Sequence, residues 1–424
     1  MFLLSNKLAR NIIVLASGSA LAQVINFLAS PIITRLYGPE VFGTFGTFTS
    51  IISLFIHLAT LSIPLTIVLE KTQDSAIRVA SVCLKVCQVS LPIILILTIL
   101  SSYGIESLSS FFDGYLLMLL MVTLIINCLV DIATYFCIRN ENFKVQSKSL
   151  LLKAVSISVC KICFGLVLPT LEILIISLIL GTLAQLWLIE KHTPIKEILV
   201  KSIHVKYRDV NVVCSKYQQI VMFRTGQNML TGLNATLPLI FINWKYGSIY
   251  AGYYVLTKTI MYLPITIIGK AVHDVFYKNI SSAVSKSQPV FRKLLLSTFA
   301  LLSLCVVPIT ILVLYGELIF SFAFGAGWSK SGSYAVLLSP WFILNFINRP
   351  YISTISVFKL EKVLFYNSCA NFILICICFK VAISSSLNDE QYLLLLGLFM
   401  SVPQLIIMLL SSIKAFKYDR LNLK

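Results

Sequence analysis

Long apolar runs alternate along the chain with short polar or Gly/Pro-containing breaks. A helix needs about 20 apolar residues to cross the hydrocarbon core of a bilayer, and the runs are of this length. They lack the apolar/polar alternation of membrane β-barrel strands. The pattern predicts an all-α integral membrane protein with twelve transmembrane helices at 11–33, 42–69, 79–100, 115–137, 150–168, 172–190, 219–243, 251–275, 294–315, 335–357, 364–383 and 392–413.

The composition agrees with this interpretation. The chain is 58% hydrophobic and 12% charged. Soluble domains are about 45–50% apolar and about 25% charged. Because a soluble core of this chain length could not bury so many apolar side chains, the composition excludes a soluble globular protein.

The net charge is +17. We do not expect nucleic-acid binding, because the basic residues form short clusters between the apolar runs, where they act as signals for membrane insertion. The segments that we assign to the outside hold only Arg35, Lys245 and Lys330. By the positive-inside rule, the protein is expected to be a multi-pass membrane protein with both termini in the cytoplasm.

The eleven cysteines do not form a recognisable site. They lie almost wholly in the apolar runs or on the basic side of the membrane, so no disulfide framework is predicted. Cys160 and Cys163 have the spacing of half a zinc site, but no second pair accompanies them. No metal or other cofactor is therefore expected.

The segment 191–218 is the longest between two spans, is basic, and lies at the midpoint of the chain. It predicts a division into an amino-terminal six-helix lobe at 1–190, a cytoplasmic linker at 191–218, a carboxy-terminal six-helix lobe at 219–413 and a cytoplasmic tail at 414–424.

A short motif recurs in the two halves. The first copy is Tyr37-Gly38 with Gly43 and Phe45. The second copy, 209 residues later, is Tyr246-Gly247 with Gly252 and Tyr254. Each copy joins an outgoing helix to an incoming one, so the halves have the same orientation. Such parallel repeats are related by a pseudo-two-fold axis along the membrane normal. Glycine suits the corner because it adopts left-handed backbone angles readily.

Three segments resemble signature segments of bacterial Wzx-type polysaccharide flippases, which belong to the MOP exporter superfamily. They are Asn11 with SGSALAQVINFLASPIITRLYGPEVFGTFGTF, Ser17 to Phe48; GSIYAGYYVLTKTIMYLPITIIGKAVHDVFY, Gly247 to Tyr277; and FGAGWSKSGSYAVLLSPWFIL, Phe324 to Leu344. The likeness extends through nearly the whole chain. Arg349-Pro350 departs from it, because this pair puts a charge where a small residue is expected.

The resemblance implies a MATE-like fold of two lobes in the bacterial inner membrane. It implies a flippase that moves undecaprenyl-diphosphate-linked oligosaccharide repeat units from the cytoplasmic to the periplasmic leaflet, for the synthesis of O-antigen or capsule. Membrane lipids are expected partners, and a polysaccharide polymerase and chain-length proteins are further candidates. No cofactor is implied, and coupling to protons or sodium ions is left open.

Lys161, Lys258 and Arg349 fall within the predicted spans, away from their ends. An ionisable side chain at the bilayer centre costs about 2.5–3.5 kcal/mol, so such residues usually face a cavity or a partner. A lipid diphosphate is anionic and rich in acceptor oxygens, which lysine and arginine bind well. We predict that these three cations contact the diphosphate.

Sugar recognition needs amides and aromatic faces. Tyr254 and Tyr262 share one helix face with Lys258 at a spacing of four residues. The further candidates for substrate binding are Gln23, Asn26, Asn228, Asn234 and Arg35. The alternative for the amides is that they join neighbouring helices by hydrogen bonds.

Asp131 and His57 are the candidates for coupling to an ion. Asp131 is a carboxylate deep in its span, and His57 could titrate near neutral pH. Asp131 could instead form a structural ion pair with Arg139 or Lys161, and His57 could merely bond a neighbouring helix.

Three other classes remain as alternatives. A multidrug cation antiporter of the same superfamily should favour buried carboxylates, whereas this chain favours buried lysine and arginine. A lipid II flippase is expected to have fourteen spans. A membrane glycosyltransferase or polymerase should carry a large outer loop, but the outer loops here are short, so the protein is not expected to be an enzyme.

Overall fold

The computed structural model describes residues 2–104, 114–358 and 360–422. These residues form helices joined by short turns, and no β-strand occurs among them. The all-α fold class is therefore confirmed. The chain divides into two compact units, Met1–Thr236 and Leu237–Lys424.

Unit 1 is a helical bundle in which α5 packs between α1 and α6. Its elements are α1 (Phe2–Thr60), η1 (Ile63–Leu69), α2 (Gln73–Gly104), α4 (Gly114–Arg139), α5 (Phe143–Gly165), α6 (Leu171–Glu190), α7 (Ile195–His204), α8 (Tyr207–Lys216) and the first part of α9 (Gln218–Tyr246).

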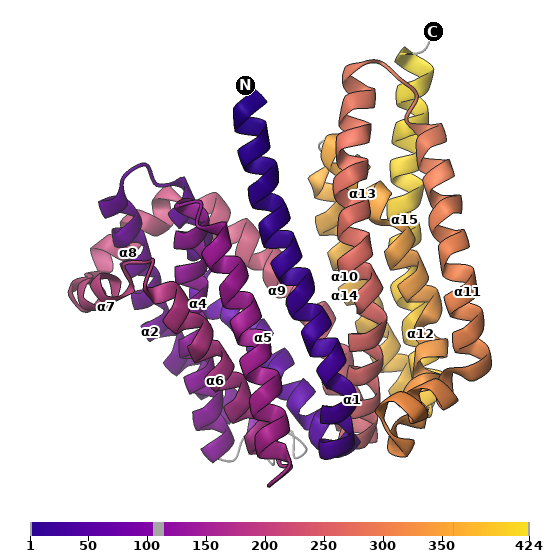
Figure 1. Ribbon diagram of the computed structural model, residues 1–424, viewed down its shortest axis with the longest axis horizontal. Helices are drawn as coiled ribbons and strands as arrows, with labels where there is room; N and C mark the ends of the chain where they lie inside the picture. The colour runs from indigo at the N-terminus through magenta and orange to yellow at the C-terminus, as the bar shows by residue number, and fades with distance from the viewer. Residues whose placement is uncertain (1, 105–113, 359, 423–424) are drawn as a thin grey trace. The chain divides into compact units, whose positions relative to one another are not determined.

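α1 contains the first two expected spans, separated by a corner at Gly38. Gly38 has φ 69° and ψ 170°, angles that glycine adopts without a Cβ penalty. The chain reverses there at the lower end of unit 1 (Figure 1). The span expected at 42–69 is not one helix, however. Leu61 and Ser62 both have positive φ, so α1 ends at Thr60 and the short helix η1 follows.

Unit 2 begins within α9. Its remaining elements are α10 (Ser248–Ser285), α11 (Phe291–Phe324), η2 (Ala326–Trp328), α12 (Ser329–Ile347), α13 (Arg349–Val357), α14 (Glu361–Ser384) and α15 (Asp389–Asn422). Gly247 makes the corner between α9 and α10 with φ 102° and ψ 169°. The two repeated Tyr-Gly motifs therefore form the same kind of corner in the two units.

The core of unit 2 is aromatic. Tyr254, Tyr334, Trp341 and Tyr392 are buried in one cluster with Phe241. Phe241 stacks on Phe379 of α14, with ring centroids 4.3 Å apart. Burial of several large rings stabilises the packing of α9, α10, α12, α14 and α15 against one another.

Eight helices of the described chain are long and apolar enough to cross a membrane, namely α1, α2, α4, α6, α10, α11, α14 and α15. This makes the protein a multi-pass membrane protein, and the count of twelve spans stays a prediction. The span expected at 335–357 is divided at Asn348 into α12 and α13, with Pro350 in the first turn of α13. Proline is tolerated there because the first turn needs no backbone N–H donor.

The segment expected to be a linker, 191–218, folds as α7 and α8 and packs against α2 of unit 1. The Ser81 hydroxyl donates to the carbonyl oxygen of Ile198 at 3.4 Å, and Arg78 pairs with Asp209 at 2.5 Å. The division into units lies further along the chain, within α9. The tail expected at 414–424 continues α15 as far as Asn422.

Candidate functional sites

Lys161 is buried in unit 1 against an aromatic ring. Its residue is 9% exposed, and its ammonium group lies 4.1 Å from the centroid of the Phe45 ring. An ammonium over a ring face is attracted by the quadrupole of the ring, more strongly where water is excluded. No carboxylate forms a salt bridge with Lys161 in the part of the chain that the structure describes.

The surroundings of Lys161 are fixed by the first glycine corner. The Tyr37 hydroxyl donates a 2.7 Å hydrogen bond to the backbone carbonyl oxygen of Lys161. Tyr37 also fills the space above Gly165, where a Cβ atom would lie 2.5 Å from the tyrosine oxygen. α5 ends at Gly165, four residues after Lys161. Lys161 is thus closer to the end of its helix than the predicted span 150–168 had placed it.

Unit 2 holds a second lysine in a related arrangement. The ammonium group of Lys258 lies 5.8 Å from the ring centroid of Tyr254, which is buried. Phe45 and Tyr254 occupy equivalent positions of the sequence repeat, 209 residues apart. Each unit therefore places an ammonium group against the aromatic ring of its own copy of the motif.

Tyr262 lies two turns after Tyr254 on α10 and is packed between aromatic rings. Its ring makes edge contacts with Trp341 and Phe342 of α12, at centroid distances of 5.8 and 5.3 Å. Tyr254 and Arg349 both interact electrostatically with Tyr262. α10 thus carries Tyr254, Lys258 and Tyr262 at a spacing of four residues, as the sequence predicted, and Arg349 of α13 lies beside the later part of α10, at Gly269.

Arg349 stands at the start of α13, beside α10. Its guanidinium donates to the side-chain oxygen of Asn345 at 2.8 Å, and its Nε atom is buried without a hydrogen-bond partner among the described residues. A Cβ atom on Gly269 would lie 3.2 Å from Arg349 Cγ, so glycine makes room for the arginine. A partly buried guanidinium whose Nε–H has no partner among the described residues is suited to binding an acceptor oxygen.

Asp131 does not form the structural ion pair considered above. Arg139 instead donates to the backbone carbonyl oxygen of Glu70 at 3.3 and 3.4 Å, and Lys161 lies on Phe45. Within the described ranges, no salt bridge involves Asp131. Asp131 interacts electrostatically with Tyr135, which also interacts with Arg224. The oxygens of the Asp131 carboxylate are therefore available to accept a hydrogen bond or bind a cation.

The other predicted residues are spread over unit 1. His57 is half-buried near the end of α1, and no hydrogen bond joins it to a neighbouring helix among the described residues. Asn228 donates to the hydroxyl of Ser62 at 3.2 Å, so it does join two helices. Of the remaining residues, Gln23 and Asn234 are partly buried, and Asn26 and Arg35 are exposed.

Three polar residues of unit 1 were not among the predicted site residues. Lys153 lies on α5, two turns before Lys161, near the start of the span expected at 150–168. The side-chain oxygens of Gln146 and Gln185 are buried and have no hydrogen-bond partner within the described ranges. Gln185 could have been identified as a candidate from the sequence, because it is a polar residue within an apolar span.

These sites contain fixed cations, amides and aromatic rings. Among the described residues, no group of three or more His, Cys, Asp or Glu side chains could hold a metal ion. Lys161 and Arg349 form no salt bridge among the described residues, and such cations can bind an anionic group and hold it by charge-assisted hydrogen bonds. Membrane-crossing helices with polar groups of this kind in both units describe a multi-pass membrane protein.

The family model for polysaccharide biosynthesis proteins matches residues 32–333. Because this match covers more than half of the chain, the protein belongs to the polysaccharide biosynthesis protein family. No curated protein matches the chain.

Solved structures of transporters resemble the whole chain. An inward-facing MATE family transporter of the MOP superfamily is 10% identical with a TM-score of 0.69, over 94% of this chain and 96% of that one. The lipid II flippase MurJ in an inward closed conformation is 13% identical with a TM-score of 0.71, over 97% and 91%. The Vibrio cholerae MATE transporter VcmN in its bent form is 11% identical with a TM-score of 0.53, over 98% and 99%.

These likenesses show that the protein has a MATE-like fold, which confirms the fold that the resemblance implied. The family match confirms the resemblance to polysaccharide biosynthesis proteins. The three solved proteins are transporters and a flippase, and none of them is described as an enzyme.

Proposed function

We propose that the protein is a flippase for undecaprenyl-diphosphate-linked oligosaccharide repeat units. It moves them from the cytoplasmic to the periplasmic leaflet of the bacterial inner membrane, by alternating access of its two lobes. The product supplies the synthesis of O-antigen or capsule. Both termini lie in the cytoplasm, as the distribution of lysine and arginine indicates.

The observation that carries this proposal is a pair of lysines on equivalent aromatic rings, the buried Lys161 on Phe45 and the partly buried Lys258 on Tyr254. Keeping an ammonium group in an apolar environment is costly, and here it occurs in both halves of a repeat. Arg349 of unit 2 adds a guanidinium whose Nε–H has no hydrogen-bond partner in the described part of the chain. A diphosphate is negatively charged and has several acceptor oxygens, so it can form charge-assisted hydrogen bonds with these cations as it passes.

The substrate class also has support from the family, whose description is polysaccharide biosynthesis. A lipid II flippase shares the fold. A lipid-linked oligosaccharide combines both features, because its diphosphate needs cations and its sugars need amides and aromatic faces. Tyr262 and Asn345 lie within the neighbourhood of Arg349 and could contact the first sugar.

The test is export of surface polysaccharide from cells in which the single variants Lys161→Ala, Lys258→Ala and Arg349→Ala replace the wild-type protein. Lys380→Ala is the control, because Lys380 is an exposed cation on the apolar helix α14. At equal protein levels, the variants of Lys161, Lys258 and Arg349 are expected to lose export, and the control is expected to keep it. Normal export by all three variants would overturn the proposal.

A cation-coupled drug exporter is the second candidate function, and Asp131 is the observation that favours it. A partly buried carboxylate with no salt bridge in the described part of the chain is suited to bind a proton or a cation. Under the flippase proposal, Asp131 and His57 are the groups that couple flipping to an ion gradient. Drug resistance that depends on Asp131, without any change in surface polysaccharide, would favour the exporter.

A further inference from the structure

α7 is a short amphipathic helix that directly follows a membrane-crossing helix. α6 ends at Glu190, and only 191–194 separate it from Ile195 at the start of α7. This turn is closed against the end of α6, because the backbone N–H groups of His192 and Thr193 donate to the carbonyl oxygens of Ile189 and Glu190. Four residues reach at most about 14 Å, so α7 begins at the level of the lipid headgroups.

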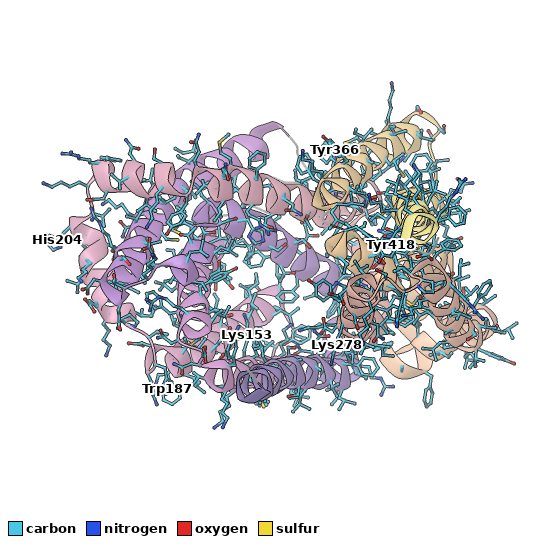
Figure 2. All side chains as sticks on the ribbon, turned by 90° about the horizontal axis from the view of Figure 1, so that it is seen from above. Lys153, Trp187, His204, Lys278, Tyr366 and Tyr418 are labelled. Atoms are coloured by element: carbon cyan, nitrogen blue, oxygen red, sulfur yellow. The ribbon has the colours of Figure 1, made fainter. Side chains whose placement is uncertain are left out.

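α7 lies at the outer side of unit 1, crosswise to α6 (Figure 1). In Figure 1 it is seen almost end-on, whereas α6 runs along the height of unit 1, and in Figure 2 both Trp187 and His204 lie at the outer edge of the unit. Trp187 on α6 marks the membrane interface, where tryptophan is enriched. A helix that lies crosswise at this level is parallel to the bilayer surface.

The two faces of α7 differ in what they contact. Ile195 and Ile198 are buried against α2, whereas Val200 is 61% exposed and Ile203 is 70% exposed. Tyr207, at the start of α8, is exposed as well. Amphipathic helices that lie in a membrane interface insert such an apolar face about 5–10 Å into the boundary between headgroups and acyl chains.

Charge identifies the lipids that suit this surface. The segment 190–216 has six lysine and arginine residues and three acidic residues. Beside Trp187, a hollow of about 460 Å³ is lined by Lys191, Lys196, Glu190, Glu197, Thr193 and Pro194. Lys191 lies over the Trp187 ring at 3.5 Å, and Lys196 pairs with Glu190 at 3.6 Å. Basic residues near a membrane surface favour anionic lipids by about 1 kcal/mol each.

We propose that the exposed face of α7 rests on the cytoplasmic leaflet and that the hollow lined by Trp187, Lys191 and Lys196 binds the phosphate of an anionic phospholipid. The exposed apolar residues Val200 and Ile203 contact the acyl chains beside it. Anionic lipid thereby holds α7 and the start of α8 in place, next to the first turn of α2. This surface is separate from the buried cations of the proposed flippase, and it requires no particular transported substrate.

The test uses the purified full-length protein in nanodiscs of phosphatidylcholine, with and without an equal amount of phosphatidylglycerol. Lys191→Gln/Lys196→Gln is compared with the control Lys286→Gln/Lys417→Gln, which removes the same charge from exposed positions of unit 2. Native mass spectrometry measures the retained phosphatidylglycerol. Two lysines at a membrane surface predict roughly 30-fold weaker binding for the first variant and wild-type binding for the control.

Hydrogen exchange of 195–208 gives a second measurement that does not depend on release of lipid into the gas phase. Phosphatidylglycerol should slow the exchange of this segment in the wild type and the control, and not in Lys191→Gln/Lys196→Gln. The proposal is overturned if phosphatidylglycerol leaves the exchange of the wild type unchanged, or if both variants respond alike. Either result would mean that α7 is covered by something other than anionic lipid.

Discussion

The hydroxyl group of Tyr37 donates a 2.7 Å hydrogen bond to the backbone carbonyl oxygen of Lys161. In unit 2, the equivalent tyrosine, Tyr246, donates a 3.0 Å hydrogen bond to the carbonyl oxygen of Leu387. Lys161 lies in the last turn of α5, and Leu387 lies in the turn after α14. α5 and α14 correspond to the fifth expected span of the first and of the second half. The repeated tyrosine therefore attaches the glycine corner to the same helix in each unit.

This relationship predicts that Gly165→Ala destabilises unit 1. The new methyl group would lie 2.5 Å from the Tyr37 oxygen, so the ring would have to move and its hydrogen bond to Lys161 would be lost. We expect a loss of about 2 kcal/mol in the free energy of unfolding, against about 1 kcal/mol for Tyr37→Phe, which removes the hydrogen bond alone. Chemical unfolding in detergent measures both.

Gly226→Ala is the control for this prediction. Gly226 is a helical glycine in α9 with no heavy atom within 4 Å of an added Cβ. Alanine should be neutral or stabilising there, because it restricts the unfolded chain more than glycine does. A Gly165→Ala protein as stable as Gly226→Ala would mean that Tyr37 is free to move.

Gly332→Ala is expected to have a larger effect in unit 2. Its Cβ would lie 2.3 Å from the backbone oxygen of Gly316, so the obstacle is backbone and not the end of a flexible side chain. α11 and α12 would have to separate, which should cost about 3 kcal/mol. Gly327→Ala, where an added Cβ meets nothing within 4 Å, is the matched change. The two variants should differ clearly in melting temperature, and equal melting temperatures would contradict the close approach of the helices.

The sequence could predict the membrane-crossing helices because lipid requires long uninterrupted apolar runs. It could also predict the two corners, because Gly38 and Gly247 supply backbone angles that other residues adopt with strain. The break after Thr60 was not predictable in the same way. Leu61 and Ser62 have positive φ there, and residues of these types give no sequence signal for such angles.

The candidate sites were predictable in part for a similar reason. Lys161 and Lys258 stand out because they interrupt apolar runs. The contact of Lys161 with Phe45 joins residues that are far apart in the sequence, and only the packing of α5 on α1 creates it. The hydrogen bonds of Arg139 to the Glu70 carbonyl oxygen are likewise tertiary, and they replace the ion pair with Asp131 that was considered as an alternative.

Acid should weaken the attachment of α8 to the turn before α2. Burial raises the pKa of Glu70, but hydrogen bonds from Lys216, Tyr217 and Ser75 lower it more, so its pKa is below the usual value. A carboxylate with a depressed pKa stabilises the fold above its unfolded pKa, about 4.3, and this stability is lost as the pH falls through the folded pKa. At neutral pH the contribution is complete.

Glu70→Gln measures this contribution. The wild type should melt at a higher temperature than Glu70→Gln at pH 7 and pH 5, by a constant margin, and the margin should shrink below about pH 4. The Lys216 ammonium group lies 2.7 Å from Glu70 and stays protonated throughout this range. A margin that is unchanged down to pH 3 would show that the charge of Glu70 does not hold α8.

Asn345→Asp should separate stability from transport. Asn345 accepts a 2.8 Å hydrogen bond from Arg349, so an aspartate there would form a salt bridge and neutralise the guanidinium. The free energy of unfolding should stay the same or rise. Flipping of an undecaprenyl-diphosphate oligosaccharide in proteoliposomes should fall by about tenfold or more, because the substrate phosphate must then compete with a fixed carboxylate.

Asn345→Ala should reduce flipping less, since it leaves the charge of Arg349 available. Asn211→Asp adds the same charge on the exposed side of α8 and should flip normally. Equal flipping by Asn345→Asp and Asn211→Asp would remove Arg349 from the transport path.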